Sequence, residues 1–180
     1  MRYKLIIALF TISTIVFFMQ STVHAQPYGK GIYDSNTPYG GQTTLSISAT
    51  SAINLSVNPS TTGTLASASG NVTVTSTDVV GYKLYIRALG LTSMTNVGST
   101  IPASANLSLG TLVVNTWGYN TDASTNFIGI TTSDVLLKNA IGPFSTGDST
   151  TVTYGLNIDR AVAAGSYSSN LVYTAVPQTN

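Results

Sequence analysis

The sequence contains no cysteine, and its only histidine, His24, stands near the start of the chain. Without thiols the protein has no disulfides, no thiolate zinc sites, no thiol nucleophile and no lipid-modified cysteine. If an N-terminal leader is removed, His24 is removed with it. The usual general base, the Ser–His and Cys–His couples and nearly all transition-metal sites are then excluded. These absences predict a protein that is not an enzyme and that holds no cofactor.

Charge is scarce: Asp, Glu, Lys and Arg make up 7% of the chain, and glutamate is absent. A chain this close to neutral lacks the basic surface that nucleic acid requires. The carboxylates stand beside Ser, Thr, Gly and Asn, as turn and cap residues do, so we expect neither catalytic nor metal-binding residues among them. They are Asp34, Asp78, Asp122, Asp134, Asp148 and Asp159.

The first 25 residues have the three parts of a secretory signal peptide. Arg2 and Lys4 precede an apolar run from Leu5 to Met19, and Ala25 offers a small residue before cleavage at Gln26. The run has about 15 residues, and a membrane-spanning helix needs about 20. We therefore expect an exported protein, extracellular or at the cell surface, with no membrane span in its mature form.

Residues 26–43 differ in composition from the rest of the chain. Pro27-Tyr28-Gly29 is echoed by Pro38-Tyr39-Gly40, and proline and glycine at this density prevent a continuous helix or central strand. The segment is predicted to be a flexible arm rich in Tyr, Gly and Pro. A second interpretation is that the arm docks on sugar, on wall material or on a neighbouring subunit.

From Thr44 onward, apolar residues alternate with Ser, Thr and Asn, the period-two pattern of a strand with one face toward the core. Ser and Thr supply 45 of the residues from 26 to 180. We predict one all-β domain over residues 44–180, an antiparallel Ig-like β-sandwich of about seven to nine strands. The expected strands are 44–57, one from Val72, 82–88, 107–114, 127–130, 152–158 and 167–175, and Asp134 to Ala140 is the only segment expected to hold a helical turn.

Three aromatic residues are candidates for contact with a ligand. Trp117 is the only tryptophan, and it stands with Tyr119 in a segment bounded by Asn115 and Asn120. Trp117 is interpreted either as a core residue or as a stacking platform for a glycan. Tyr85 shares one face of its predicted strand with Lys83 and Arg87, which makes that face a candidate contact patch.

Two segments resemble the WxL-type domains of bacterial cell surfaces. Gly81-Tyr82-Lys83-Leu84-Tyr85-Ile86 resembles the family's first Trp-x-Leu strand, with Tyr82 in place of Trp and Leu84 in place. The segment from Ala164 to Pro177 resembles its closing strand, with Tyr173 in the second Trp position. The resemblance implies a secreted β-sandwich, held non-covalently at the cell wall, often together with other surface proteins.

These features together favour a non-enzymatic secreted or cell-surface protein, a structural or adhesive binding module at the cell envelope. Its expected partners are the envelope, a glycan, other surface proteins or further copies of itself. One alternative is a pilin-like filament subunit that assembles by β-strand addition, with residues 44–57 as the donated strand. Another is a carbohydrate-binding module that uses Trp117.

Overall fold

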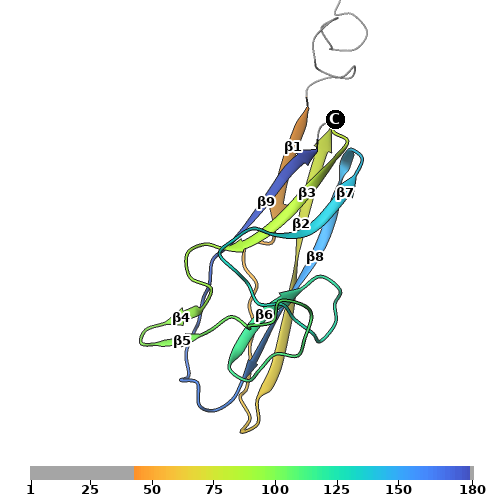
Figure 1. Ribbon diagram of the computed structural model, residues 1–180. Helices are drawn as coiled ribbons and strands as arrows, with labels where there is room; N and C mark the ends of the chain where they lie inside the picture. Colours follow the sequence, from red (N-terminus) through yellow and green to blue (C-terminus); the bar gives the residue numbers. More distant parts are fainter. Residues whose placement is uncertain (1–42, 179–180) are drawn as a thin grey trace, which may run out of the picture. The chain divides into compact units, whose positions relative to one another are not determined.

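The computed structural model describes residues 43–178, and all of them belong to the second of two units into which the chain divides after Gly41. The predicted signal peptide and nearly all of the predicted arm lie outside the described residues. Within residues 43–178 there is no helix, and the nine strands confirm the all-β prediction (Figure 1). They are β1 (Thr44–Ala49), β2 (Thr64–Thr77), β3 (Gly81–Ala88), β4 (Met94–Asn96), β5 (Ser99–Ile101), β6 (Thr116–Asn120), β7 (Val135–Ile141), β8 (Phe144–Ile158) and β9 (Leu171–Gln178).

Two antiparallel sheets make up the domain, as expected for a sandwich. The first has four strands in the order β1-β2-β8-β6, and the second has three in the order β7-β3-β9. A short turn from β2 into β3 carries the chain from the first sheet to the second, and the β7–β8 turn carries it back. Strands β4 and β5 form a separate hairpin.

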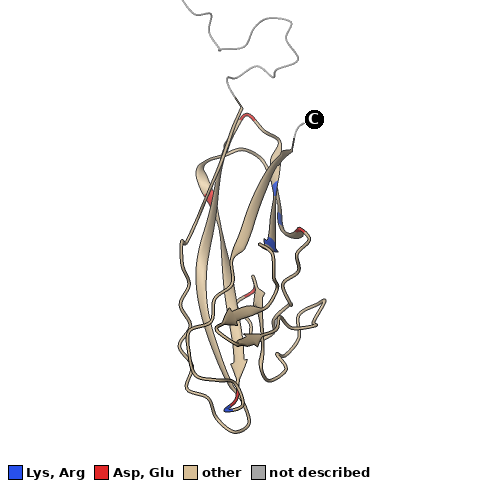
Figure 2. Cartoon of the chain, turned by 90° about the vertical axis from the view of Figure 1, so that its left-hand side faces the viewer, with Lys and Arg blue, Asp and Glu red and all other residues tan. Residues whose placement is uncertain are grey.

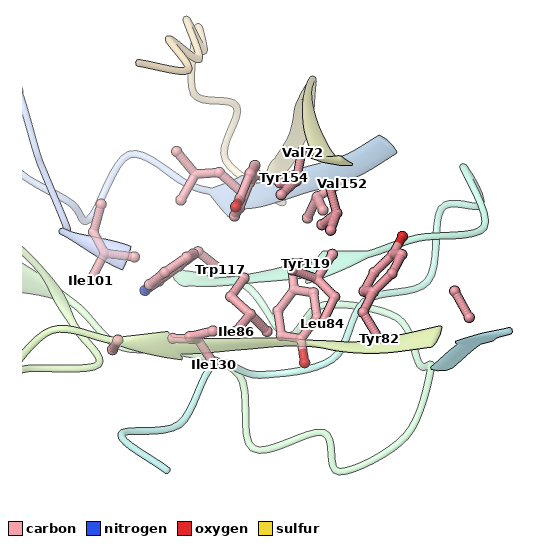
Figure 3. Packing of buried hydrophobic residues seen from close by; sticks show 14 of the residues in the cluster. Val72, Tyr82, Leu84, Ile86, Ile101, Trp117, Tyr119, Ile130, Val152 and Tyr154 are labelled. Carbon is pink, nitrogen blue, oxygen red and sulfur yellow. The ribbon is translucent and has the colours of Figure 1, made fainter. Parts of the chain in front are cut away.

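The core lies between the two sheets, and it is built by the period-two alternation of their strands (Figure 3). Tyr82, Leu84 and Ile86 of β3 are fully buried, and they meet Val152 of β8 and Val74 of β2. Each such side chain contributes about 1.5–3 kcal/mol by leaving water, which is why the alternation dictates the fold. The predicted division of β3 into an inward and an outward row is confirmed.

The short strands β1 and β6 pair with opposite ends of the long β2–β8 pair. Strands β2 and β8 pair along their whole length, from Thr64 opposite Ile158 to Ser76 opposite Phe144. Strand β1 pairs with only Val72–Thr77 of β2, whereas β6 pairs with only Thr153–Asn157 of β8. Each long strand therefore has a paired half and an unpaired half along its outer edge, on opposite halves of the sheet.

Several predicted elements differ from the structure. Strand β2 begins at Thr64, earlier than the predicted Val72. Of the strand predicted over residues 44–57, only Thr44–Ala49 forms a strand, and Ile53, Leu55 and Val57 pack against the core from an extended segment. The predicted helical turn at 134–140 is strand β7, because pairing with β3 outweighs the local capping signal of Ser133.

Residues 107–114 are a loop, although a strand was predicted there. The amide of Asn106 donates to the carbonyls of Thr111 and Phe127, at 3.1 Å each, and so holds the loop in a non-extended form. The loop makes only an isolated β-bridge, between Gly110 and Phe127, and joins no sheet as a strand. The free edge of β6 is covered by other segments: Trp117 bonds to Pro102 and Ser104, and Tyr119 bonds to Ile128.

Candidate functional site

The structure separates the three aromatic candidates. Trp117 is 1% exposed and Tyr119 is 2% exposed, and both point between the sheets (Figure 3). The indole N–H of Trp117 donates to the carbonyl of Thr92 at 3.0 Å. Neither ring presents a face to a ligand at the surface. Tyr85 is on the outward row of β3 and remains accessible.

The WxL-like positions lie in the core as well. Tyr82 and Leu84 are fully buried on the inner face of β3. Tyr173 of β9 is half-buried, and its hydroxyl shares a hydrogen bond with that of Tyr154. In this structure these positions pack the two sheets together.

Burial keeps the core tyrosines neutral. It raises the pKa of Tyr154, with the neighbouring Tyr173 adding to the effect, and it raises the pKa of Tyr119 and of Tyr173 itself. The pKa of Tyr82 is raised by burial first and then by the hydrogen bond to Asp148. None of these four hydroxyls is therefore a phenolate near neutral pH.

A salt bridge and a hydrogen bond connect the two sheets at Asp148. The ammonium of Lys138 on β7 lies 2.7 Å from Oδ1 of Asp148 on β8, and the hydroxyl of Tyr82 donates to Oδ2 at 2.7 Å. Burial of Asp148 raises its pKa, but the bonds from Lys138 and Tyr82 outweigh that effect and hold the pKa below its ordinary value. The link joins one sheet to the other, and its role is structural.

The outer face of the three-stranded sheet carries the candidate site, which we call the Tyr85 face. Strand register places Leu136 of β7 and Thr174 of β9 on either side of Tyr85. Leu136 is 49% exposed and Val176, beside Lys83, is 44% exposed. The face consists of Lys83, Tyr85, Arg87, Leu136, Thr174 and Val176. The alternation of β3 predicts the row of Lys83, Tyr85 and Arg87, but no local pattern indicates the flanking residues, because only strand pairing brings β7 and β9 beside β3.

Positive charge gathers on this sheet. Of the four cations among residues 43–178, Lys83 and Arg87 lie on the Tyr85 face and Lys138 lies on β7 (Figure 2). Nε of Arg87 lies 3.4 Å from Oδ1 of Asp134, whereas Lys83 makes no ion pair with a described residue. The face therefore joins apolar surface to an unpaired ammonium group.

The outer face of the four-stranded sheet has a different chemistry. Apart from Leu65 and Gly155, its outward positions on β1, β2 and β8 carry Ser, Thr and Asn, and none of them carries a charge. Many of these groups bond to one another across strands, as between Thr44 and Thr77 at 2.7 Å and between Ser69 and Thr153 at 2.8 Å. Hydroxyls that satisfy each other offer less to a ligand than the Tyr85 face does.

Comparisons with protein families, with curated proteins and with solved structures find no match to this chain. The WxL-like resemblance therefore stays a prediction. Among the residues that the structure describes, no helix is long and apolar enough to cross a bilayer.

Proposed function

We propose that this chain is a non-enzymatic, exported surface protein that acts as an adhesive binding module, with the Tyr85 face as its contact surface. The observation that carries the proposal is a half-apolar sheet face, with an aromatic ring at its centre, that no described segment covers. Soluble domains rarely leave apolar side chains grouped in this way unless something binds there.

The chemistry of the face indicates the kind of ligand. The ring of Tyr85 with Leu136 and Val176 suits a flat apolar surface, such as one side of a sugar ring. Lys83 and Arg87 are four residues apart on one strand, so their Cα atoms are separated by about 13 Å. The face therefore favours an extended envelope polymer that bears acidic groups at intervals.

The positions of residues 44–49 and of Trp117 bear on the two alternative functions. Residues 44–49, the start of the strand expected to be donated in a filament, pair with β2 of the same chain over six residues. Trp117, on which the carbohydrate-binding alternative was based, is enclosed in the core. Both observations favour a module that binds through Tyr85.

Co-sedimentation of the purified protein with cell-envelope material tests the proposal. Tyr85→Ala is expected to weaken binding about tenfold or more, as loss of a central aromatic contact does. Lys83→Ala should weaken binding mainly at low salt, because the charge that it removes is screened at high salt.

A matched control is Ser46→Ala, an exposed change on the outer face of the other sheet. It should bind as the wild type does. Wild-type binding by Tyr85→Ala, in a protein with an unchanged far-ultraviolet circular dichroism spectrum, would show that this face is not the contact surface.

A further inference from the structure

Two side-chain amides join across the outer face of the three-stranded sheet, at the end of the sheet beyond Lys83. Nε2 of Gln178 on β9 donates to Oδ1 of Asn139 on β7 at 2.7 Å. Between them lies Gly81 of β3, which pairs with Ile141 of β7 on one side and with Gln178 on the other. Because Gly81 carries no side chain, the two amides can reach each other over it. We call this pair the amide bridge.

The amide bridge depends on the bare backbone of Gly81. A Cβ atom there would lie 2.6 Å from Oε1 of Gln178 and 2.1 Å from the carbonyl oxygen of Ala140, which is closer than non-bonded atoms approach. The amide of Gln178 therefore lies directly against the strand. In this position it covers Gly81, which is buried although it belongs to the outward row of β3.

The amide bridge leaves one donor group and one acceptor free. A hydrogen bond between two amides uses one N–H and one oxygen, so Nδ2 of Asn139 and Oε1 of Gln178 remain available. Within residues 43–178 neither atom has another hydrogen-bond partner. Asn139 is exposed and Gln178 is half-buried, so a ligand at the surface can reach both side chains.

This arrangement suits a sugar ring. Each hydroxyl of a sugar both donates and accepts, so neighbouring hydroxyls can bond to Nδ2 of Asn139 and to Oε1 of Gln178. Because each amide holds the other in place, less conformational entropy is lost when a ligand binds. Ile141 pairs with Gly81 on the same outer face and is 86% exposed, so it offers apolar surface to the C–H groups of the ring.

The ammonium group of Lys83 adjoins the amide bridge. Lys83 pairs with Asn139 of the bridge, and Tyr85 follows it by two residues, about 7 Å along β3. Lys83 forms no ion pair with a described residue, whereas Arg87 shares its charge with Asp134 at 3.4 Å. The free positive charge of the Tyr85 face therefore lies at the end that carries the amide bridge, where it favours an anionic group on the ligand.

We propose that the amide bridge, Lys83 and Ile141 form a subsite for one sugar unit that bears an anionic group, next to the unit that stacks on Tyr85. This inference rests on the proposed function, because it names the ligand class of the same face. The amides bind hydroxyls of the ring, and the ammonium binds the carboxylate or phosphate that the unit carries. A neutral polymer would leave Lys83 without a partner, so the face selects acidic polysaccharides.

Binding to two matched pairs of polymers, at low ionic strength, tests the subsite. Polygalacturonate and phosphomannan present the two kinds of anion, and methyl-esterified polygalacturonate and unphosphorylated mannan are their neutral counterparts. At least one acidic polymer is expected to bind, and its neutral counterpart should bind about threefold to tenfold more weakly, because the charge-assisted contact with Lys83 is lost. The pair that shows the difference identifies the anion.

Substitutions assign this difference to particular residues. Lys83→Met is expected to bind the acidic polymer as weakly as its neutral counterpart. Asn139→Ala should weaken binding of both polymers by a similar factor, about twofold to tenfold, since it removes only contacts with hydroxyls. Lys138→Met removes the same charge from a side chain that bonds to Asp148 between the sheets, and Asn71→Ala removes an exposed amide from β2. Both controls should bind as the wild type does.

Failure to bind either acidic polymer would overturn the subsite, and so would equal binding of each acidic polymer and its neutral counterpart. A preference for the acidic polymer that persists in Lys83→Met would overturn it too. Far-ultraviolet circular dichroism spectra confirm that the variants fold. These outcomes are separate from the sedimentation of Tyr85→Ala with envelope material, so the contact face is tested independently of the subsite.

Discussion

Gly155 lies beneath an aromatic ring. It faces Gly118 across the β6–β8 pairing, and the ring of Phe127, from the loop after β6, lies over it. A Cβ atom on Gly155 would come within 2.4 Å of Cζ of Phe127, which is closer than non-bonded atoms approach. The glycine thus lets a buried ring hold the loop against the outer face of the sheet.

Gly155→Ala is expected to lower the free energy of unfolding by about 1–3 kcal/mol, because it overpacks the site. Phe127→Ala should lower it by about 3–5 kcal/mol through loss of a buried ring. The double variant should lose less free energy of unfolding than the two single variants lose together, because the new methyl group fits the space that the ring vacates. Urea denaturation of the four proteins measures the coupling, and strict additivity would contradict the contact.

The buried tyrosines predict a loss of stability in alkali. The folded-state pKa values of Tyr82, Tyr119, Tyr154 and Tyr173 are raised above 10.0, whereas in the unfolded chain these groups ionise near that pH. Above it the unfolded state releases protons that the folded state retains, so unfolding becomes more favourable. The stabilisation is complete below pH 10 and is lost as pH rises through the folded-state values.

Denaturant titrations between about pH 8 and pH 11 should show this decline in the free energy of unfolding. In the same samples, phenolate absorbance from these four groups should appear together with unfolding. Ionisation of all tyrosines in a protein that remains folded would contradict their burial.

At this scale the sequence predicts some contacts and misses others. Alternation alone assigns Tyr82, Leu84 and Ile86 to the core, because each residue's place depends on its immediate neighbours. The contact of Phe127 with Gly155 depends on a loop folding over the sheet, for which no local pattern exists. Only part of the Tyr85 face is predicted, for the same reason. Its β3 row follows from neighbouring residues in the sequence, whereas Leu136 and Val176 reach it only through strand pairing.

Among the elements, β7 owes its position to tertiary contacts. Its sequence carries a capping signal, yet it forms a strand that pairs with β3 and is tied to β8 through Lys138 and Asp148. The two side chains are 33% and 16% exposed, so the pair is only partly screened by water.

Lys138→Met is expected to lower the free energy of unfolding by about 1 kcal/mol at neutral pH, since one charge-assisted bond to Asp148 is lost. The folded-state pKa of Asp148 is lower than the ordinary value of 3.8. Its contribution to the free energy of unfolding is therefore complete above pH 3.8 and is lost as the pH falls through the folded-state pKa. The difference from wild type should therefore narrow on acidification.

Denaturation at about pH 7 and about pH 2.5 measures the difference. Lys83→Met is the matched control, because Lys83 lies on β3 without a described ion pair, and it should match wild type at both values. A deficit of equal size at both pH values would show that the Lys138 stem, and not its charge, stabilises β7.

Element boundaries follow from the size of the inward residues. The first half of β2 places Ala66, Ala68 and Gly70 inward, too small to produce an alternation of large apolar residues. Ile53 fills the space beside Gly70, so the strand is completed by a segment distant in sequence. Conversely, Leu107 and Leu109 alternate correctly but are 91% and 45% exposed in a loop.

Strand β1 enters the domain at Thr43, whose hydroxyl donates to the carbonyl of Asp78 at 3.4 Å, and it then runs away from that end along β2 (Figure 1). A pull on Thr43 along the strand, resisted at the Tyr85 face, would load the β1–β2 hydrogen bonds in shear, all at once and not one by one. If the Tyr85 face binds as proposed, this geometry would give the bound module resistance to mechanical force through its outermost strand.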